Sequence, residues 1–121
     1  MPTDTALDVI ERERGRCAVC GLNIDGKGHI HHRKPRGMGG SGLQAHRLSN
    51  LVYLHSSCHL KHVEQQRERA YMNGWLLEHW QDSWAVPMMY MLNGWVLLKD
   101  DGLIVPVTIN REEGTWKEEG R

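Results

Sequence analysis

Cysteine and histidine residues at the two ends of one segment have the spacing of a zinc site. Cys17 and Cys20 are separated by two residues, and a Cys-x2-Cys turn directs both sulfurs at one metal ion. We expect His55 and Cys58, which repeat this spacing, to supply the other two ligands. In the alternative pairing His62 replaces His55, because Cys58 and His62 lie about one helical turn apart. Either set predicts a tetrahedral structural Zn2+.

The number of cysteines argues against a disulfide-bonded protein. The chain has three, and an odd number does not fit a closed disulfide framework. The competing interpretation is a redox pair, Cys17 and Cys20, with Cys58 as a buried thiol. A redox Cys-x2-Cys pair usually lies beside a βαβ unit, which the sequence does not predict. Zinc binding is therefore favoured.

A second group of residues has the composition of a phosphodiesterase site. Adjacent histidines on a strand point to opposite faces, so His31 and His32 are expected to do different work. One can bind a divalent cation that neutralises the scissile phosphate, and the other can take a proton from the attacking water. His59, in the first turn of a helix, would complete the metal site opposite His31, and Asn50 can orient the base. Each of these residues taken alone could have an ordinary structural role. The order in which all of them occur along the chain is specific to a catalytic site.

The elements that must position these residues follow from hydrophobic pattern and turn signals. The central feature is a pair of strands separated by a glycine-rich loop and followed by one long helix. The ranges are a helix over 5–14, strands over 28–33 and 49–54, a flexible loop over 37–42 and a helix over 58–72.

The rest of the chain is expected to be a β-rich extension. Its candidate strands cover 86–92, 95–98 and 103–107, joined by the turns Asn93-Gly94 and Asp100-Asp101-Gly102. Residues 111–121 are polar and predict a flexible tail. We expect one α+β domain, with a nuclease core over 8–70 and a β-rich extension over 71–110.

Charge is unevenly distributed although the formal net charge is zero. Residues 1–70 hold eleven Lys and Arg against seven Asp and Glu, whereas residues 71–121 hold four against eight. No acidic residue occurs between Asp25 and Glu64. This pattern suggests a phosphate-facing surface, although a chance distribution of solvated charge would produce it too. The candidate nucleic-acid-binding residues are Arg33, Lys34, Arg36, Arg47 and Lys61.

The location of the protein is predicted from two absences in the sequence. No apolar run approaches the roughly 18–20 residues that cross a bilayer. The first residues carry acids and lack the apolar segment of a signal peptide. We expect a cytoplasmic protein.

Residues 17–62 resemble the HNH endonuclease family, in its zinc-containing subgroup. The matching motifs are Cys17-Ala-Val-Cys20, His31-His32-Arg33, Asn50-Leu51 and Leu54-His55-Ser-Ser-Cys58-His59. The chain is further similar to small HNH proteins of actinobacterial phages, through the stretches 31–40 and 94–102. The resemblance implies a ββα-metal (His-Me finger) core, and a phosphodiesterase that nicks or cuts DNA.

The resemblance also implies individual roles. His31 and His59 would bind the catalytic ion, His32 would be the general base and Asn50 would orient it. Arg33, Lys34 and Arg36 would contact phosphate. The catalytic ion would be Mg2+, or the Mn2+ or Ni2+ that a histidine-rich site also suits. In the host cytoplasm, the phage large terminase subunit would be a partner in genome packaging.

The chain departs from the subgroup at two positions. His55 stands where the subgroup usually has cysteine, which would make the zinc site Cys3His. Val63 stands where related enzymes often have a third metal ligand, and His62 lies one residue earlier as an alternative ligand. The competing function is a non-catalytic zinc module that binds nucleic acid or a packaging partner. Such a module would need the zinc site and a basic surface, but neither His32 nor Asn50.

Overall fold

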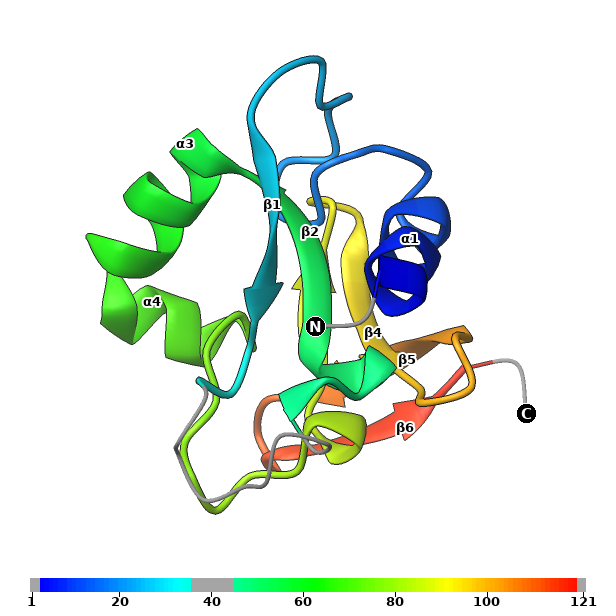
Figure 1. The fold of residues 1–121 in the computed structure, drawn as a ribbon. Helices are drawn as coiled ribbons and strands as arrows, with labels where there is room; N and C mark the ends of the chain where they lie inside the picture. The colour runs from blue at the N-terminus through cyan, green and yellow to red at the C-terminus, as the bar shows by residue number, and fades with distance from the viewer. Residues whose placement is uncertain (1–2, 36–44, 120–121) are drawn as a thin grey trace.

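The chain is a mixed helix and sheet protein, as the sequence predicts. The computed structural model describes residues 3–35 and 45–119. Helix α1 (Thr3–Arg12) lies on one side of a two-stranded sheet, and α3 (Ser56–Cys58) and α4 (Arg67–Met72) lie on its other side (Figure 1). A separate four-stranded sheet follows in the C-terminal half. Of the described helices, none is long and apolar enough to cross a membrane.

The two-stranded sheet carries the histidine motif. Strand β1 (Gly28–His32) pairs antiparallel with β2 (Leu51–His55), with His31 opposite Val52. The short 3-10 helix η1 (Leu48–Asn50) leads into β2. Both predicted strands are confirmed, with ends that differ from the predicted ones by one or two residues. The predicted loop over 37–42 lies outside the described residues.

The helix after β2 differs from the single helix predicted over 58–72. The structure has α3 (Ser56–Cys58), the π-helix η2 (His59–Glu64) and α4 (Arg67–Met72). The break falls at Gln66, whose φ of −137° and ψ of 60° are not helical. Residues 64–69 are all polar, so no buried side chain among them holds a straight helix against the core. The helix propensities of the residues alone could not predict this interruption.

The C-terminal sheet contains the three predicted strands and one more. In order, β3 (Met88–Tyr90), β4 (Gly94–Leu98), β5 (Ile104–Asn110) and β6 (Thr115–Glu118) pair antiparallel with their neighbours. The short 3-10 helix η3 (Ser83–Ala85) precedes them. Strand β6 corrects the prediction of a flexible tail over 111–121. Its side chains are mostly exposed, so it lacks the apolar alternation by which a strand is recognised in sequence.

The β3–β4 turn lies two residues before the predicted Asn93-Gly94 turn. Met91 and Leu92 have positive φ angles of 54° and 57°, which residues with side chains rarely adopt. The Met91 amide donates to the Ala18 carbonyl at 2.6 Å, beside the turn between the first two cysteines. A tertiary contact therefore overrides the local preference for turning at Asn-Gly.

One buried cluster joins the two halves of the chain. Its members come from the first cysteine turn, β2, the segment from α3 to the residues just after α4, and the C-terminal sheet: Cys17, Ala18, Val19, Val52, Leu54, Cys58, Val63, Ala70, Trp75, Leu76, Met88, Val96 and Leu98. The fully buried Glu13 adds a polar link, because it accepts hydrogen bonds from the Tyr90 hydroxyl at 2.8 Å and the Tyr53 amide at 3.1 Å. The C-terminal sheet thus packs directly against the histidine hairpin.

An ion pair near η1 predicts a small acid-sensitive contribution to stability. Asp100 accepts from Arg47 Nη1 at 2.6 Å and from the Ser49 amide at 3.2 Å. Burial by itself raises the pKa of Asp100, but hydrogen bonds from Ser49 and the charge of Arg47 outweigh it, so the pKa lies below its ordinary value. A lowered carboxyl pKa stabilises the fold at neutral pH, and this stabilisation disappears as pH falls below about 4.

We therefore expect Asp100→Asn to lower the free energy of unfolding at pH 7 by no more than about 1 kcal/mol, because the pair is partly exposed. At pH 3 the difference in stability between the wild type and the variant should be smaller than at pH 7. Urea unfolding at both pH values measures the two differences. An equal difference at pH 7 and pH 3 would contradict the role of the ionised carboxylate.

Candidate metal centre and nuclease site

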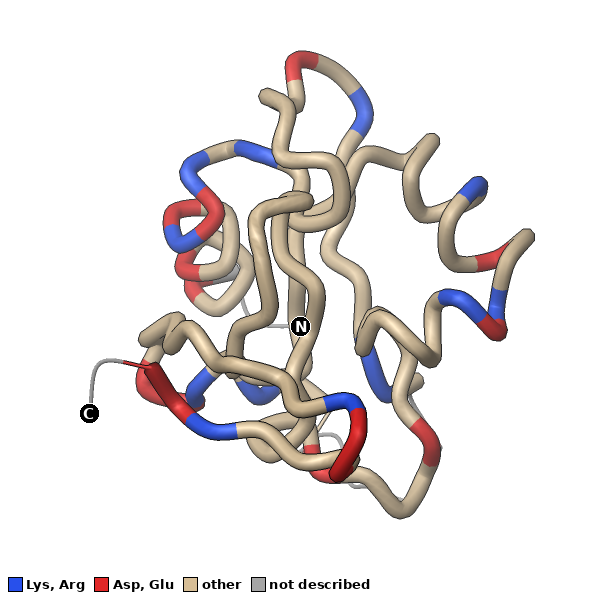
Figure 2. Tube along the Cα trace, turned by 180° about the vertical axis from the view of Figure 1, so that it is seen from behind, with Lys and Arg blue, Asp and Glu red and all other residues tan. Residues whose placement is uncertain are grey.

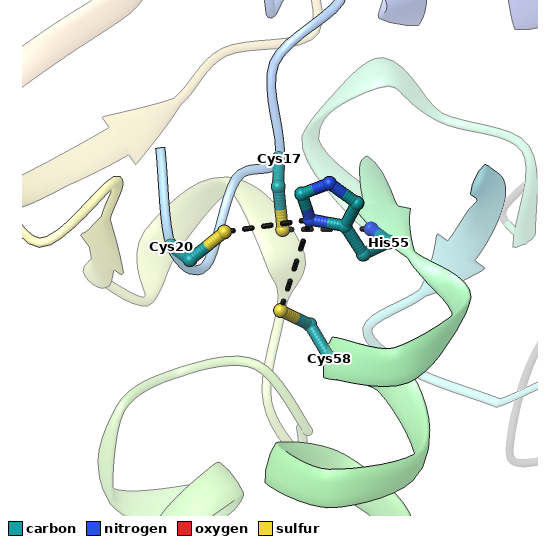
Figure 3. A group of neighbouring side chains, drawn as sticks. All are labelled: Cys17, Cys20, His55 and Cys58. Atoms are coloured by element: carbon teal, nitrogen blue, oxygen red, sulfur yellow. Dashed lines mark hydrogen bonds between the residues drawn. The ribbon is translucent and has the colours of Figure 1, made fainter. Parts of the chain in front are cut away.

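The structure brings together the four residues expected to bind zinc. Figure 3 shows Cys17, Cys20, His55 and Cys58 pointing toward a common centre. Their donor atoms all lie within 4.8 Å of one another. His55 Nδ1 is 3.4 Å from Cys20 Sγ and 3.9 Å from Cys58 Sγ. Ligand atoms around a tetrahedral zinc are roughly 3.5–3.8 Å apart, so the donor set and its spacing fit this ion.

Local backbone geometry explains why the first two thiols meet. Gly21 closes the turn after them, with a φ of 79° and an amide that donates to the Cys17 carbonyl at 2.8 Å. A side chain at this position would be strained and would stand 3.0 Å from the Met91 carbonyl oxygen. The other two ligands come from the ends of successive elements, His55 from β2 and Cys58 from α3.

The ring of His55 is held in the form that a metal ligand requires. Its Nε2 lies 3.1 Å from the carbonyl oxygen of Asn23, which can only accept a hydrogen bond. The ring proton is therefore on Nε2, and Nδ1 offers its lone pair toward the three sulfurs. A backbone carbonyl behind a coordinating imidazole is the usual second contact of metal-bound histidine.

The cysteine thiols lie close together and are partly or fully buried, so a bound cation would favour their ionised form. Burial, together with the charges of the other two cysteines, raises the pKa of Cys58 to about 12. Burial also acts against ionisation of Cys17, but backbone amides of Cys20, His55 and Val19 outweigh it and lower the pKa of that thiol. A bound Zn2+ would supply the positive charge that the protein itself does not.

His62, the alternative zinc ligand, lies elsewhere. Its ring packs edge-on against Trp75, with the ring centres 6.4 Å apart. It is not a member of the cysteine cluster, and it does not line the histidine pocket described next. The structure thus brings His55 rather than His62 to the thiols.

A pocket of about 390 Å3 lies between β1 and the η2–α4 segment. Four imidazoles line it, those of His29, His31, His32 and His59. Glu64 and Arg67 also line it, and neither was identified from the sequence. His29 was missed as well, although it is two residues before His31 and strand alternation places both on one face.

His31 is the most buried of these histidines. Its Nε2 donates to the Trp75 carbonyl at 2.6 Å, so the unprotonated nitrogen is Nδ1. Burial, and after it the neighbouring histidines, lowers the pKa of His31 to about 4, even though the Trp75 carbonyl acts in the opposite direction. The ring is therefore neutral at physiological pH, as a metal ligand must be.

The residues expected to bind a catalytic cation fit that role in part. The ring centres of His31 and His59 are 5.0 Å apart, and both rings line the same pocket. His59 Nε2 lies 3.6 Å from a Glu64 carboxylate oxygen. Over residues 3–35 and 45–119, the cysteine cluster is the one group of three or more His, Cys, Asp or Glu side chains whose donor atoms are already placed to hold a metal ion. Cation binding in the pocket would therefore require the imidazoles to turn toward the ion.

His32, the expected general base, contacts a histidine that the sequence did not single out. His32 Nε2 is 3.4 Å from Nδ1 of His46, and the two ring centres are 5.4 Å apart. His46 comes from the chain just before η1, whereas His32 ends β1. The structure thus places a second imidazole beside the expected base.

Asn50, which was expected to orient the base His32, forms hydrogen bonds with backbone atoms. Its side-chain oxygen accepts from the Lys34 amide at 2.8 Å, and its amide group donates to the carbonyls of Lys34 at 3.2 Å and Ala45 at 3.0 Å. The buried Asn50 therefore fixes backbone on both sides of the segment 36–44. These contacts hold the backbone close to His32, at Lys34, and next to His46, at Ala45.

Arg33 was expected to contact phosphate, and the structure contradicts this. The side chain is fully buried and donates four hydrogen bonds to backbone carbonyls. Burial, and to a lesser extent the charge of Arg12, lowers the pKa of Arg33 to about 9, so the guanidinium is still charged at neutral pH. Arg33 belongs to the same covered face as His31, two residues earlier, and its role is structural.

The other expected phosphate contacts have different positions. Arg47 is paired with Asp100 and lies 4.6 Å over the Trp84 ring, so its charge is already engaged. Lys61 is exposed and Lys34 is half-buried. Arg36 lies outside the described residues. Figure 2 shows acidic residues between the basic ones of the η2–α4 segment, and α1 carries three acidic residues, Asp4, Asp8 and Glu11, beside Arg12. These segments therefore do not form a continuous basic face.

Comparison with known proteins agrees with this arrangement. Residues 17–65 match the HNH endonuclease family model. No curated protein and no solved structure matches the chain. The matched segment starts at Cys17 and ends after the π-helix, so it contains both the cysteine cluster and the four pocket histidines. Residues 17–65 are therefore similar to the HNH endonuclease family, and the Cys3His cluster that they contain is consistent with zinc binding.

Proposed function

We propose that this protein is a metal-dependent HNH endonuclease that hydrolyses phosphodiester bonds of DNA. The observation that carries the proposal is the histidine pocket inside the matched segment, where His31, His32 and His59 line one surface. The family match alone implies a nucleic-acid substrate. The convergence of these imidazoles supports hydrolysis in addition to binding.

The proposed mechanism assigns proton transfer to His32. Its imidazole takes a proton from a water molecule that attacks the scissile phosphorus. The bond to the 3′ oxygen breaks, and that oxygen takes a proton from solvent, which leaves a 5′-phosphate and a 3′-hydroxyl. A neutral imidazole with a pKa near the working pH suits this task. When bound by His31 and His59, a divalent cation supplies neutralisation of phosphate charge and stabilisation of the leaving oxygen. Asn50 maintains the backbone position of the base, through its contacts with Lys34 and Ala45.

The proposal predicts a large loss of activity in His32→Ala. Removing a general base costs typically 10²–10⁴-fold in rate, so conversion of supercoiled plasmid to nicked or linear DNA should fall by at least about 100-fold. His79→Ala is the matched control, because His79 is exposed and lies outside the matched segment. Plasmid cleavage with Mg2+ or Mn2+ measures the effect, with zinc content measured for all three proteins.

The outcome separates the enzyme from the competing function. Equal cleavage by wild type and His32→Ala would exclude His32 as the base. If zinc-loaded wild type binds DNA but cleaves none with either ion, the protein is a non-catalytic zinc module that binds nucleic acid. The resemblance of residues 31–40 and 94–102 to phage HNH proteins extends the proposal to genome packaging, with the large terminase subunit as partner. Adding that subunit to the cleavage assay tests the extension.

A further inference from the structure

The strand that carries the histidine motif presents two imidazoles, rather than one, to the helix that covers it. His29 and His31 alternate with Ile30, so both lie on the same face of β1. Their strand partners Leu54 and Val52 are fully buried, which shows that this face is covered. The cover includes the π-helix η2, whose first residue is His59.

Three imidazole rings therefore meet at one place. The ring centres of His29 and His59 are 4.5 Å apart, and those of His31 and His59 are 5.0 Å apart. Both pairs meet edge to face. Imidazoles in neighbouring positions around one cation have ring centres roughly 4.5–5.5 Å apart, given metal–nitrogen distances near 2.1 Å. The ring centres are thus spaced as they are around a shared cation, and rotation of the imidazoles would bring their nitrogens to it without movement of the backbone.

Contacts with oxygen atoms occupy one nitrogen of each ring. His29 Nδ1 is 3.3 Å from the Ser56 hydroxyl, and His31 Nε2 donates to the Trp75 carbonyl. His59 Nε2 lies 3.6 Å from the Glu64 carboxylate. The Trp75 carbonyl can only accept, so it leaves Nδ1 of His31 as the nitrogen that can bind a cation. Oxygen partners of this kind orient metal-bound histidines. Ser56 and Glu64 act in the same way on His29 and His59 when the contacting nitrogen of each ring carries the proton.

We propose that His29 is a third protein ligand of the catalytic cation, together with His31 and His59. This assignment rests on the proposed function, because it concerns the ion of that same site. Val63, where related enzymes often have the third ligand, is apolar and fully buried and cannot supply it. Three imidazoles favour Mn2+ or Ni2+ over Mg2+, which prefers oxygen ligands.

Manganese binding tests this assignment without reference to cleavage. Mn2+ is titrated into the zinc-loaded full chain, and free Mn2+ is measured by electron paramagnetic resonance. Wild type should bind one Mn2+, and His29→Ala should weaken binding by at least about 10- to 100-fold. His62→Ala is the matched control, because it removes a nearby histidine that does not line the pocket.

A second measurement separates ligation from a structural effect. Pulsed electron paramagnetic resonance detects histidine nitrogens bound to Mn2+, and wild type should show three whereas His29→Ala should show two. His29→Asp, which retains a side chain able to bind the ion, should recover part of the affinity. Zinc content reports whether each variant is folded.

The ways in which the assignment can fail are distinguishable. If His59→Ala abolishes Mn2+ binding but His29→Ala binds as wild type with an unchanged nitrogen count, the His29 assignment is wrong and the proposed function stands. If His62→Ala weakens binding instead, the third ligand comes from the helix. If wild type binds no Mn2+ at all, the metal-dependent function fails together with this assignment.

Discussion

Removal of zinc is expected to unfold the protein, and Cys58→Ser is expected to have nearly the same effect. Structural zinc in small domains contributes on the order of 10 kcal/mol of apparent folding free energy. The total stability of most domains is only about 5–15 kcal/mol. Cys58 lies in the buried cluster that joins the hairpin to the C-terminal sheet, so loss of the metal would loosen both halves.

The expected unfolding has a direct measurement. Zinc-loaded wild type should show one cooperative thermal transition, which a chelator should abolish and added Zn2+ should restore. Ser57→Ala is the matched control for Cys58→Ser, because Ser57 is the exposed neighbour of the ligand. Comparing His55→Ala with His62→Ala adds a test of the ligand set, since only the former should lose zinc. A metal-free wild type that unfolds cooperatively at the temperature of the loaded protein would refute a structural role.

The cysteine cluster could be predicted from sequence because its geometry is local at each end. Two short turns, Cys17 to Cys20 and His55 to Cys58, each fix the distance between two ligands, so only their meeting had to be inferred. The β1–β2 hairpin brings them together, and its strands were visible from their β-forming residues. Local patterns of this kind are sufficient when each half of a site lies within a few residues.

The histidine pocket was harder to predict, because its residues are brought together by the packing of one face of β1 against the η2–α4 segment and not by short spacing along the chain. Alternation along β1 implies that His29 accompanies His31, but the adjacent pair His31 and His32 dominates the motif. His46 contacts His32 across 14 residues, through a path that no local pattern specifies. The break at Gln66 and the early turn at Met91 likewise depend on tertiary packing.

Arg33 shows most clearly how charge can mislead a prediction made from sequence. In a basic segment, an arginine after two histidines suggested a phosphate contact. The alternation that buries His31 also buries Arg33, and its amide continues the strand pairing by donating to the Asn50 carbonyl at 2.8 Å. The side chain then links the hairpin to the C-terminal half. Its four hydrogen bonds go to the carbonyl of Ser49 in η1 and to those of three residues between α4 and β3, namely Gly74, Ser83 and Val86.

We therefore expect Arg33→Met to destabilise the fold by about 3–5 kcal/mol, a large part of the total. Methionine fills a similar volume but leaves buried carbonyl oxygens without donors, and each such group costs roughly 1–3 kcal/mol. Arg33→Lys should recover only part of the loss, because one ammonium group cannot reach all four carbonyls in the planar geometry of a guanidinium. Urea unfolding of the zinc-loaded proteins measures both changes.

Arg111→Met is the control for Arg33→Met, because Arg111 is exposed and its loss should change stability by less than about 0.5 kcal/mol. A phosphate contact predicts the opposite pattern for Arg33. In that case Arg33→Met would leave stability unchanged and would weaken DNA binding. The slope of log affinity against log salt concentration would fall in magnitude by about one. Arg33→Lys distinguishes the two roles, since lysine would preserve a phosphate contact but not the four hydrogen bonds to backbone carbonyls. DNA binding is measured on the folded variant. If Arg33→Lys is as stable as wild type, the four carbonyl contacts do not hold the hairpin to the C-terminal half.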